Sequence, residues 1–370
     1  MTELPFTRPT LGEEEIRSVQ KVLESGWITS GPRVAELEQR LAQYIGGGVT
    51  VRLFNSATSA LEAVLLAMRI GQGDEVIVPA MSFVASANVV VRAGATPVFI
   101  DVELANRNLN VDLVESALTL RTRAILPVHF AGLPVDMHPI HQLVGDQNIL
   151  LLEDAAQAIG TVYQGRQVGS SGNPVVFSFQ ANKNMTTIEG GAVACRDDEL
   201  VRHLEAIRFH GIALNDLGEM MVDDWGGKMN MPDVCAAVGL AQLKNLDRFI
   251  KQRRELAQCY LRNLPNHPAL LLPVDSPGHS WHMFCVCLDF TAIGMSRREV
   301  VESFKQNNIM IGIHYPAMHL FGLYRRLGYG PGDFPIAERI GEQTLTLPLF
   351  PAMSKEDVER VCTHFRSLMV

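Results

Sequence analysis

Short apolar segments of five or six residues alternate with helix-like segments through the first half of the chain, and this alternation limits the possible fold more than any other feature. Strands joined by helices form parallel sheets that carry helices on both faces. The sequence therefore predicts an α/β fold with a mainly parallel sheet. The expected strands are 49–54, 74–79, 97–101, 123–128, 148–152, 175–179 and 190–195.

The segments between these strands have apolar residues at helical spacing. No Gly-x-Gly-x-x-Gly motif follows an expected strand, and the three glycines at 46–48 come before a strand instead of after one. The sequence therefore argues against a dinucleotide cofactor. The expected helices are 13–24, 32–45, 60–68, 80–87, 111–118, 198–210 and 232–246.

A single lysine, Lys183, lies in the polar segment between the expected strands 175–179 and 190–195. Burying an ammonium group costs several kcal/mol, on the order of its lost hydration, so a lysine kept there tends to have a chemical role. The usual role is that of an amine nucleophile or Schiff-base former. A surface hairpin with its lysine in water is the alternative, and this pattern alone leaves both interpretations open.

An aspartate, Asp154, follows the apolar run 148–152, and small residues come directly after it. The carboxyl end of a buried strand is where ligands bind in open α/β sheets. An aspartate that keeps a pyridine nitrogen protonated and a lysine that holds an aldehyde are the pair that pyridoxal 5'-phosphate (PLP) requires. Asp154 and Lys183 are therefore the candidate catalytic residues.

Two motifs, Glu-Asp-Ala-Ala-Gln at 153–157 and Ser-Phe-x-x-x-Lys-Asn-x-Thr-Thr-x-Glu-Gly-Gly at 178–191, together resemble the DegT-type (DegT/DnrJ/StrS) aminotransferases of nucleotide-linked keto-sugars. The resemblance extends over nearly the whole chain. It implies the type I fold of PLP-dependent transferases, which is aspartate aminotransferase-like. Such a protein has a large PLP-binding domain with a mainly parallel seven-stranded sheet, expected at 1–247, and a small C-terminal α+β domain, expected at 248–370.

The resemblance also implies which residues bind the cofactor. Ala57, Thr58 and Ser178 would hold the phosphate, Phe83 would lie flat on the pyridine ring, and Gln157 would contact the ring's 3-oxygen. Free N–H groups at a helix start do favour anions. The sequence alone also allows a plain helix cap at 55–60 and a core aromatic at Phe83.

Further residues are implied at the substrate and at a subunit interface. Lys228 and Asn230 would reach the cofactor phosphate of the neighbouring subunit in a homodimer, although Gly227 replaces the usual aromatic before the lysine. Thr29, His314 and Tyr315 would border the sugar nucleotide. An ordinary helix connector at 25–32 and an aromatic-rich turn at 314–319 are the alternatives.

The function that the resemblance implies is transfer of an amino group from glutamate to a UDP- or dTDP-linked 4-keto-sugar. A related branch of the family dehydrates its substrate and has histidine in place of the lysine, so Lys183 favours transamination. The segments 6–9, 25–32 and 228–230 most resemble the branch that makes UDP-4-amino-4-deoxy-L-arabinose for lipopolysaccharide modification. The alternatives are a PLP-binding regulatory protein, a nucleotide-sugar dehydratase and an NAD-dependent sugar oxidoreductase.

Composition narrows the class of partner and the compartment. With 47% hydrophobic residues, 19% charged residues and a net charge of −8, the chain is that of a globular protein and has no basic face for nucleic acid. Its six cysteines show no CxxC and no zinc-like spacing. Residues 1–9 show no basic region followed by an apolar core and no apolar run is long enough for a membrane helix, so we expect neither a signal peptide nor a membrane span. We therefore expect a cytoplasmic protein.

The second half of the chain has weaker patterns. We expect an irregular segment at 212–225, a charged helix face that includes Arg253, strands at 281–288 and 309–314, a helix at 296–306, and a final helix that Ser354 and Asp357 cap. His129 follows a strand, but no nucleophile and acid accompany it in the sequence. It is therefore interpreted as a structural residue.

Overall fold

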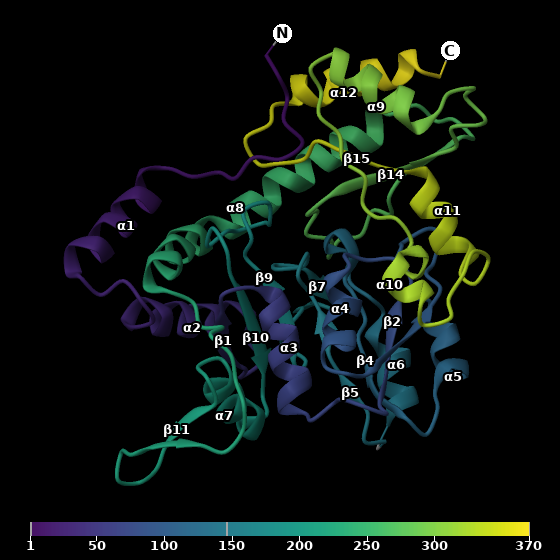
Figure 1. Cartoon of the computed structure of the whole chain (residues 1–370). Helices are drawn as coiled ribbons and strands as arrows, with labels where there is room; N and C mark the ends of the chain where they lie inside the picture. The colour runs from purple at the N-terminus through teal and green to yellow at the C-terminus, as the bar shows by residue number, and fades with distance from the viewer. Residues whose placement is uncertain (1, 146, 370) are drawn as a thin grey trace.

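A computed structural model describes residues 2–145 and 147–369 (Figure 1). In this part of the chain the large sheet has seven strands. Two four-stranded ladders join where β5 and β6 continue each other, with Leu152 between them and a bridge from Val128 to Asp154. β10 runs antiparallel to both neighbours, and the other neighbouring strands are parallel. The strand order is β3 (Thr96–Ile100), β2 (Glu75–Pro79), β4 (Thr122–Ile125), β5 (Leu150–Leu151) with β6 (Glu153–Asp154), β9 (Val175–Ser178), β10 (Gly191–Cys195) and β1 (Thr50–Phe54).

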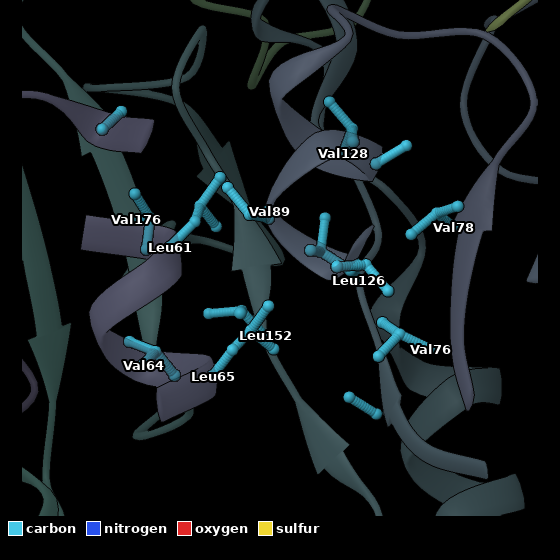
Figure 2. Packing of buried hydrophobic residues seen from close by; sticks show 14 of the residues in the cluster. Leu61, Val64, Leu65, Val76, Val78, Val89, Leu126, Val128, Leu152 and Val176 are labelled. Carbon is cyan, nitrogen blue, oxygen red and sulfur yellow. The ribbon is translucent and has the colours of Figure 1, made fainter. Parts of the chain in front are cut away.

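Alternate residues of these strands enter separate cores on the two faces of the sheet, as the period of a strand requires. Val76 and Val78 of β2 pack on one face, together with α3 (Ala57–Ala67) and α4 (Ala85–Arg92) (Figure 2). Ile77, which lies between them, packs on the other face with α6 (Met137–Val144). The expectation of a parallel sheet covered on both faces is therefore confirmed.

Helix α8 (Asp233–Asn263) is the longest element and runs past α1 (Glu13–Ser25) and α2 (Pro32–Ile45) toward the C-terminal part of the molecule (Figure 1). The buried amide of Gln242 on α8 donates to Glu15 of α1. The other helices with side chains in these layers are α5 (Val114–Ala117) and α7 (Asp198–Ile207), and a short antiparallel ribbon is formed by β7 (Val162–Tyr163) and β8 (Arg166–Gln167). Among the described residues, no helix has both the length and the apolar character needed to cross a bilayer.

The C-terminal part is an antiparallel sheet of β13 (Leu270–Leu271), β14 (Phe284–Leu288) and β15 (Thr344–Leu347), which packs with α9 (Arg297–Gln306) and α12 (Lys355–Ser367). The helices α10 (Gly322–Arg325) and α11 (Pro335–Gln343) complete it. Leu4 from the N-terminal segment lies in the same core. Since α8 also runs unbroken through residue 248, the division into domains 1–247 and 248–370 stays a prediction.

Three expectations for the second half of the chain are wrong. Residues 212–225 contain a hairpin of β11 (Ile212–Leu214) and β12 (Met220–Val222), because Asn215 and Gly218 form a tight turn. No continuous strand covers 309–314, since Ile309 pairs with Leu4 and Gly312 with Thr346.

The third error concerns Arg253, which is only 2% exposed and is not part of a charged face. Its guanidinium donates to the main-chain oxygens of His282 and Leu349 over 3.1 and 2.8 Å. Sequence spacing on the helix does not reveal these acceptors, because they come from distant segments.

Candidate active site

Asp154 ends β6 at the carboxyl edge of the sheet and is 4% exposed. Its Oδ2 accepts a hydrogen bond from the Ser86 hydroxyl at 2.7 Å, and its Oδ1 accepts from the Ala156 N–H at 3.0 Å. Burial raises the pKa of this carboxyl, while these two hydrogen bonds and the charge of Lys183 oppose the rise. The side chain is thus a buried carboxylate that lacks a directly bonded cation, and a protonated ring nitrogen would supply one.

Lys183 lies in the turn that joins β9 to β10, and its main-chain N–H donates to Gln180 O at 2.9 Å. Desolvation lowers the pKa of its half-buried amine to about 8, although the charge of Asp154 acts in the opposite direction. Roughly a tenth of the amine is therefore neutral at pH 7, far more than for a free lysine, and the neutral form is the one that acts as a nucleophile. The structure brings Lys183 and Asp154 within electrostatic reach of each other.

Gly191, the first residue of β10, lies between the start of α3 and the end of β9. Sheet register pairs Gly191 with Ser178, and a Cβ on Gly191 would come within 2.4 Å of the Ala57 nitrogen. The Ser56 side chain caps the helix by accepting from the Ser59 N–H at 3.0 Å. The N–H groups of Ala57 and Thr58 belong to the first turn, where no intrahelical acceptor is available. The three residues predicted to hold phosphate, Ala57, Thr58 and Ser178, therefore lie around Gly191. We call this group the anion cradle; a side chain at position 191 would fill it.

Between this cradle and the C-terminal part lie Phe83, Gln157 and Tyr315. Phe83 is 53% exposed, and its ring centroid is 5.9 Å from that of Tyr315. Gln157 Oε1 accepts from the Ala131 N–H at 2.7 Å, which turns its Nε2 toward the Tyr315 hydroxyl at 3.4 Å. An exposed aromatic face, a fixed amide donor, a buried carboxylate and an anion cradle together fit the groups of PLP.

The other predicted residues lie at the edges of this site. His314 stacks on Phe6 with ring centroids 5.2 Å apart, and its Nδ1 is 2.9 Å from the Thr346 hydroxyl. Burial is the first cause that lowers the pKa of His314 to about 4, and the charge of Lys183 is the second. His314 therefore lies near the lysine as a neutral ring.

The segments that contain Thr29 and Asn230 meet near the end of β1. The Asn230 side chain donates a hydrogen bond to the hydroxyl of Ser30, the residue after Thr29, across 200 residues of sequence. Thr29 is exposed, and its carbonyl accepts from the Asp233 N–H at 3.2 Å. Asn230 forms a bridge with Phe54, and its Oδ1 is buried without a partner.

The main chain of Lys228 lies beside the start of α3, where its carbonyl accepts from the Asn55 amide at 3.1 Å, but its amine is directed elsewhere. Its Nζ lies over the Phe209 ring, 4.5 Å from the centroid. This position is compatible with a lysine that serves another subunit, but the described residues include no second subunit. Its role stays a prediction.

The sequence interpretation missed two contributors to the site. Ser86 falls in the expected helix 80–87 but is not predicted as a site residue. Its spacing of four from Ser82 could have indicated a polar helix face directed at the strand ends, and the two hydroxyls do lie 3.2 Å apart. Burial and then the charge of Lys183 lower the pKa of His282, so this ring lies near the lysine. Its place in an apolar stretch gives no signal in the sequence. His129 is fully buried, and its ring nitrogens contact Glu153 Oε2 at 3.1 Å and the Val135 N–H at 3.0 Å, as expected for a structural histidine.

The fold and the site together define a PLP-dependent aminotransferase of the type I fold. Comparison with known families and structures supports this class. The model of the DegT/DnrJ/EryC1/StrS aminotransferase family matches residues 9–366, and the chain belongs to this family.

Solved structures of sugar aminotransferases are similar along their whole length. Spr1654 of Streptococcus pneumoniae, assigned as a sugar aminotransferase, is 30% identical in its PMP form, with a TM-score of 0.93 and 99% of each chain covered. DesV of S. venezuelae is 32% identical, with a TM-score of 0.91 and coverage of 99% of this chain and 98% of that chain. PseC of Helicobacter pylori, an aminotransferase of pseudoaminic acid biosynthesis, is 29% identical, with a TM-score of 0.92 and coverage of 100% and 99%. Because Spr1654 was solved in PLP and PMP forms, these relatives support PLP as the cofactor of this enzyme.

Proposed function

We propose that this aminotransferase moves the amino group of glutamate to a nucleotide-linked 4-keto-sugar, with Lys183 and Asp154 as its catalytic residues. The observation that carries this proposal is a buried carboxylate at the end of β6 and, in the turn that follows the adjacent parallel strand β9, a lysine whose pKa is lowered. When bound, PLP supplies an electron sink for the substrate carbon that loses a proton.

Lys183 has two tasks in this proposal. Its Nζ would hold the aldehyde of the cofactor, and its amine would carry a proton to or from the substrate carbon. One group serves both tasks because a half-buried amine with a pKa of about 8 is partly neutral near neutral pH. A histidine, as in the dehydratase branch, could not hold the cofactor in this way, so Lys183 favours transamination.

Asp154 would orient the cofactor and keep its ring nitrogen protonated. Hydrogen bonds from Ser86 and Ala156 offset only part of the desolvation cost of this carboxylate, since its pKa is still raised. A cation such as a protonated ring nitrogen facing the carboxylate would offset the rest. In the same proposal, the N–H groups of Ala57 and Thr58 and the Ser178 hydroxyl bind the phosphate.

Two side chains position the cofactor ring itself. The exposed ring of Phe83 would cover one face of the pyridine and exclude water from it. Gln157 donates from Nε2 to the 3-oxygen, since Ala131 already occupies its Oε1.

For the second substrate, we propose a UDP-linked 4-keto-pentose that becomes UDP-4-amino-4-deoxy-L-arabinose, with Thr29, His314 and Tyr315 at the sugar nucleotide. The segments 6–9, 25–32 and 228–230 support this choice by their resemblance. In this proposal the enzyme serves lipopolysaccharide synthesis in the cytoplasm. The six unpaired cysteines fit a reducing compartment.

We further propose a homodimer in which Lys228 and Asn230 serve the partner's phosphate. The hairpin of β11 and β12 supports it, because the hairpin projects from the molecule (Figure 1) and exposes a run of apolar side chains. These are Leu214, Leu217, Met220, Met221, Val222 and Trp225. Sedimentation of the protein and of Lys228→Ala, with PLP affinity measured on each, tests this arrangement. An unchanged PLP affinity in the variant would contradict it.

Borohydride reduction followed by peptide mapping tests the core of the proposal. We expect a pyridoxyl adduct on Lys183 and absorbance near ~410–430 nm, the range of a PLP Schiff base rather than of nicotinamide. The enzyme loaded with pyridoxamine phosphate is then mixed with single nucleotide keto-sugars. Recovery of the 410–430 nm band by a UDP-linked 4-keto-pentose, and not by dTDP-linked 4-keto-6-deoxyhexoses, is the expected result. An adduct with no recovery by any keto-sugar would favour a regulatory protein.

A further inference from the structure

A small cavity of about 10 Å³ is lined by Asn182, the residue before Lys183, and has room for one oxygen-sized group. Three distant segments line it: Phe6 and Thr7 near the N-terminus, Asn182 next to Lys183, and His282 just before β14. Leu347 and Leu349 close its other side. The stacking of Phe6 on His314 connects this cavity to the proposed substrate cleft.

Two polar atoms at this cavity lack partners within the described residues. His282 is 5% exposed, and its Nδ1 makes no hydrogen bond. Asn182 Oδ1 is also buried without a partner. Buried polar groups are nearly always hydrogen-bonded because leaving one unsatisfied is costly, so two such atoms at one cavity point to a polar ligand that binds there.

The charges that act on His282 are cationic. After burial, which is the main cause, Lys183 and Arg253 lower the pKa of His282 well below its usual value. Arg253 is buried and donates to main-chain carbonyls, and no salt bridge links it to a carboxylate in the described part of the chain. The lining of the cavity contains no acidic residue. The surroundings therefore favour an anion.

We propose that this cavity binds a carboxylate of the amino donor, with His282 and Asn182 as its ligands. The inference rests on the proposed function, since it assigns a binding position for the donor of that reaction. An amino acid whose nitrogen takes the place of Lys183 Nζ carries its α-carboxylate one carbon away. That carboxylate must therefore be met by donors within a few ångströms of the lysine.

The residues present can supply these donors. A neutral imidazole donates from one of its two nitrogens, and the buried Nδ1 of His282 makes no hydrogen bond within the described residues, so it is free to be the donor. The amide oxygen and nitrogen of Asn182 are interchangeable in assignment, so the side chain can present its NH₂ group. The Thr7 hydroxyl, from the segment 6–9 singled out in the sequence, is the third donor at the lining. One carboxylate oxygen enters the cavity, and the rest of the donor lies toward Lys183.

Calorimetric titration of the PLP-loaded enzyme with glutarate, a dicarboxylate without an amino group, tests the proposal without turnover. His282→Leu should raise the Kd for glutarate at least about tenfold, since a hydrogen bond to a charged group is lost. His282→Asn keeps a donor at the Nδ1 position and should stay within about threefold of the wild type. Asn182→Asp adds a negative charge of the same shape and should abolish binding. His364→Asn, on α12, is the control with no expected effect.

Thermal unfolding of each variant separates loss of binding from loss of folding, and the isosteric Asn182→Asp keeps the test decisive if His282→Leu does not fold. Glutarate affinities equal to that of the wild type in His282→Leu or Asn182→Asp would overturn the proposal and assign the cavity to an ordered water alone. Failure of the proposed function gives a different result, which is absence of the pyridoxyl adduct on Lys183.

Discussion

The hydroxyl of Ser86 donates to Asp154 Oδ2 over 2.7 Å, and both side chains are buried. This bond joins the start of α4 to the end of β6 across 68 residues of sequence. It fixes the orientation of the carboxylate before any ligand binds. Asp154 is thus held by the helix that covers the sheet as well as by its own strand.

Replacing Ser86 by alanine should weaken both stability and cofactor binding. The buried carboxylate loses its shortest hydrogen bond, which costs about 1–3 kcal/mol because the acceptor is charged. Urea unfolding of the apoprotein and titration with PLP measure the two effects. Ser116→Ala removes an exposed hydroxyl that donates only to Leu113 O, and it should change neither. Equal PLP affinity in Ser86→Ala and wild type would show that Asp154 does not face the cofactor.

The ammonium of Lys183 should reduce the stability of the apoprotein at neutral pH. Its pKa is about 8 in the folded chain and 10.5 in the reference state, so the folded protein binds this proton less tightly. Stability contributed by Lys183 therefore rises as the pH increases from 8 to 10.5. Lys183→Met should be more stable than the wild type below pH 8, by about 1–3 kcal/mol with allowance for partial exposure.

The measurement is urea unfolding of both apoproteins between pH 7 and 10. Taking the difference between the two proteins removes the titration of tyrosines and cysteines that they share. We expect the stability difference to narrow as the pH rises through this window. A difference that stays constant would mean that the lysine titrates as an exposed residue.

The sequence predicted the large sheet and the Lys183 and Asp154 positions because their signals are local. Each residue adjoins an apolar run that identifies a strand, and a ligand at the strand ends follows from the fold class. Ser86, Arg253 and His282 depend on partners from distant segments, so no window of sequence contains their signal. The hairpin of β11 and β12 was missed because its exposed apolar residues lack the alternation of a half-buried strand.

Gly191→Ala should displace the start of α3 from β10. The added Cβ would lie 2.4 Å from the Ala57 nitrogen and 2.5 Å from the Ser56 carbonyl carbon, and main-chain atoms cannot rotate away. We expect a loss of about 1–3 kcal/mol on thermal unfolding, the typical cost of overpacking. Affinity for PLP should fall as well. Gly330→Ala is the matched control, because its Cβ would meet nothing within 4 Å.

Gln157→Leu should destabilise the protein more than Tyr315→Phe. The first change leaves the buried Ala131 N–H without its 2.7 Å acceptor, at a cost of about 1–3 kcal/mol. The second removes only a 3.4 Å contact between Gln157 Nε2 and the Tyr315 hydroxyl, worth less than about 1 kcal/mol. Urea unfolding of both apoproteins gives the comparison. The reverse order would mean that Gln157 is held mainly by Tyr315.

Glu153, on the opposite side of the strand from Asp154, should be a pH-dependent source of stability. Burial works to raise the pKa of this carboxyl, but hydrogen bonds from His129, Asn173 and Ser171 outweigh burial and lower it. The His129 ring donates from Nε2, since its Nδ1 accepts from the Val135 N–H. A folded-state pKa below the unfolded value of 4.5 stabilises the protein above pH 4.5. This stability is lost as the pH falls through the folded-state pKa.

Two substitutions at Glu153 separate the charge from the hydrogen bonds. Glu153→Leu leaves the partner side chains His129, Asn173 and Ser171 without an acceptor and should cost at least about 3 kcal/mol. Glu153→Gln should cost only about 1 kcal/mol at pH 7, because the Asn173 amide and the Ser171 hydroxyl can turn to accept from its NH₂ group. The stability difference between Glu153→Gln and the wild type should narrow from pH 7 to pH 3, since the stability that the ionised form supplies is lost only below 4.5, as the pH approaches the lowered folded-state pKa. Chemical unfolding of the apoproteins at both pH values measures it, and a difference independent of pH would show that Glu153 is already neutral in the folded protein.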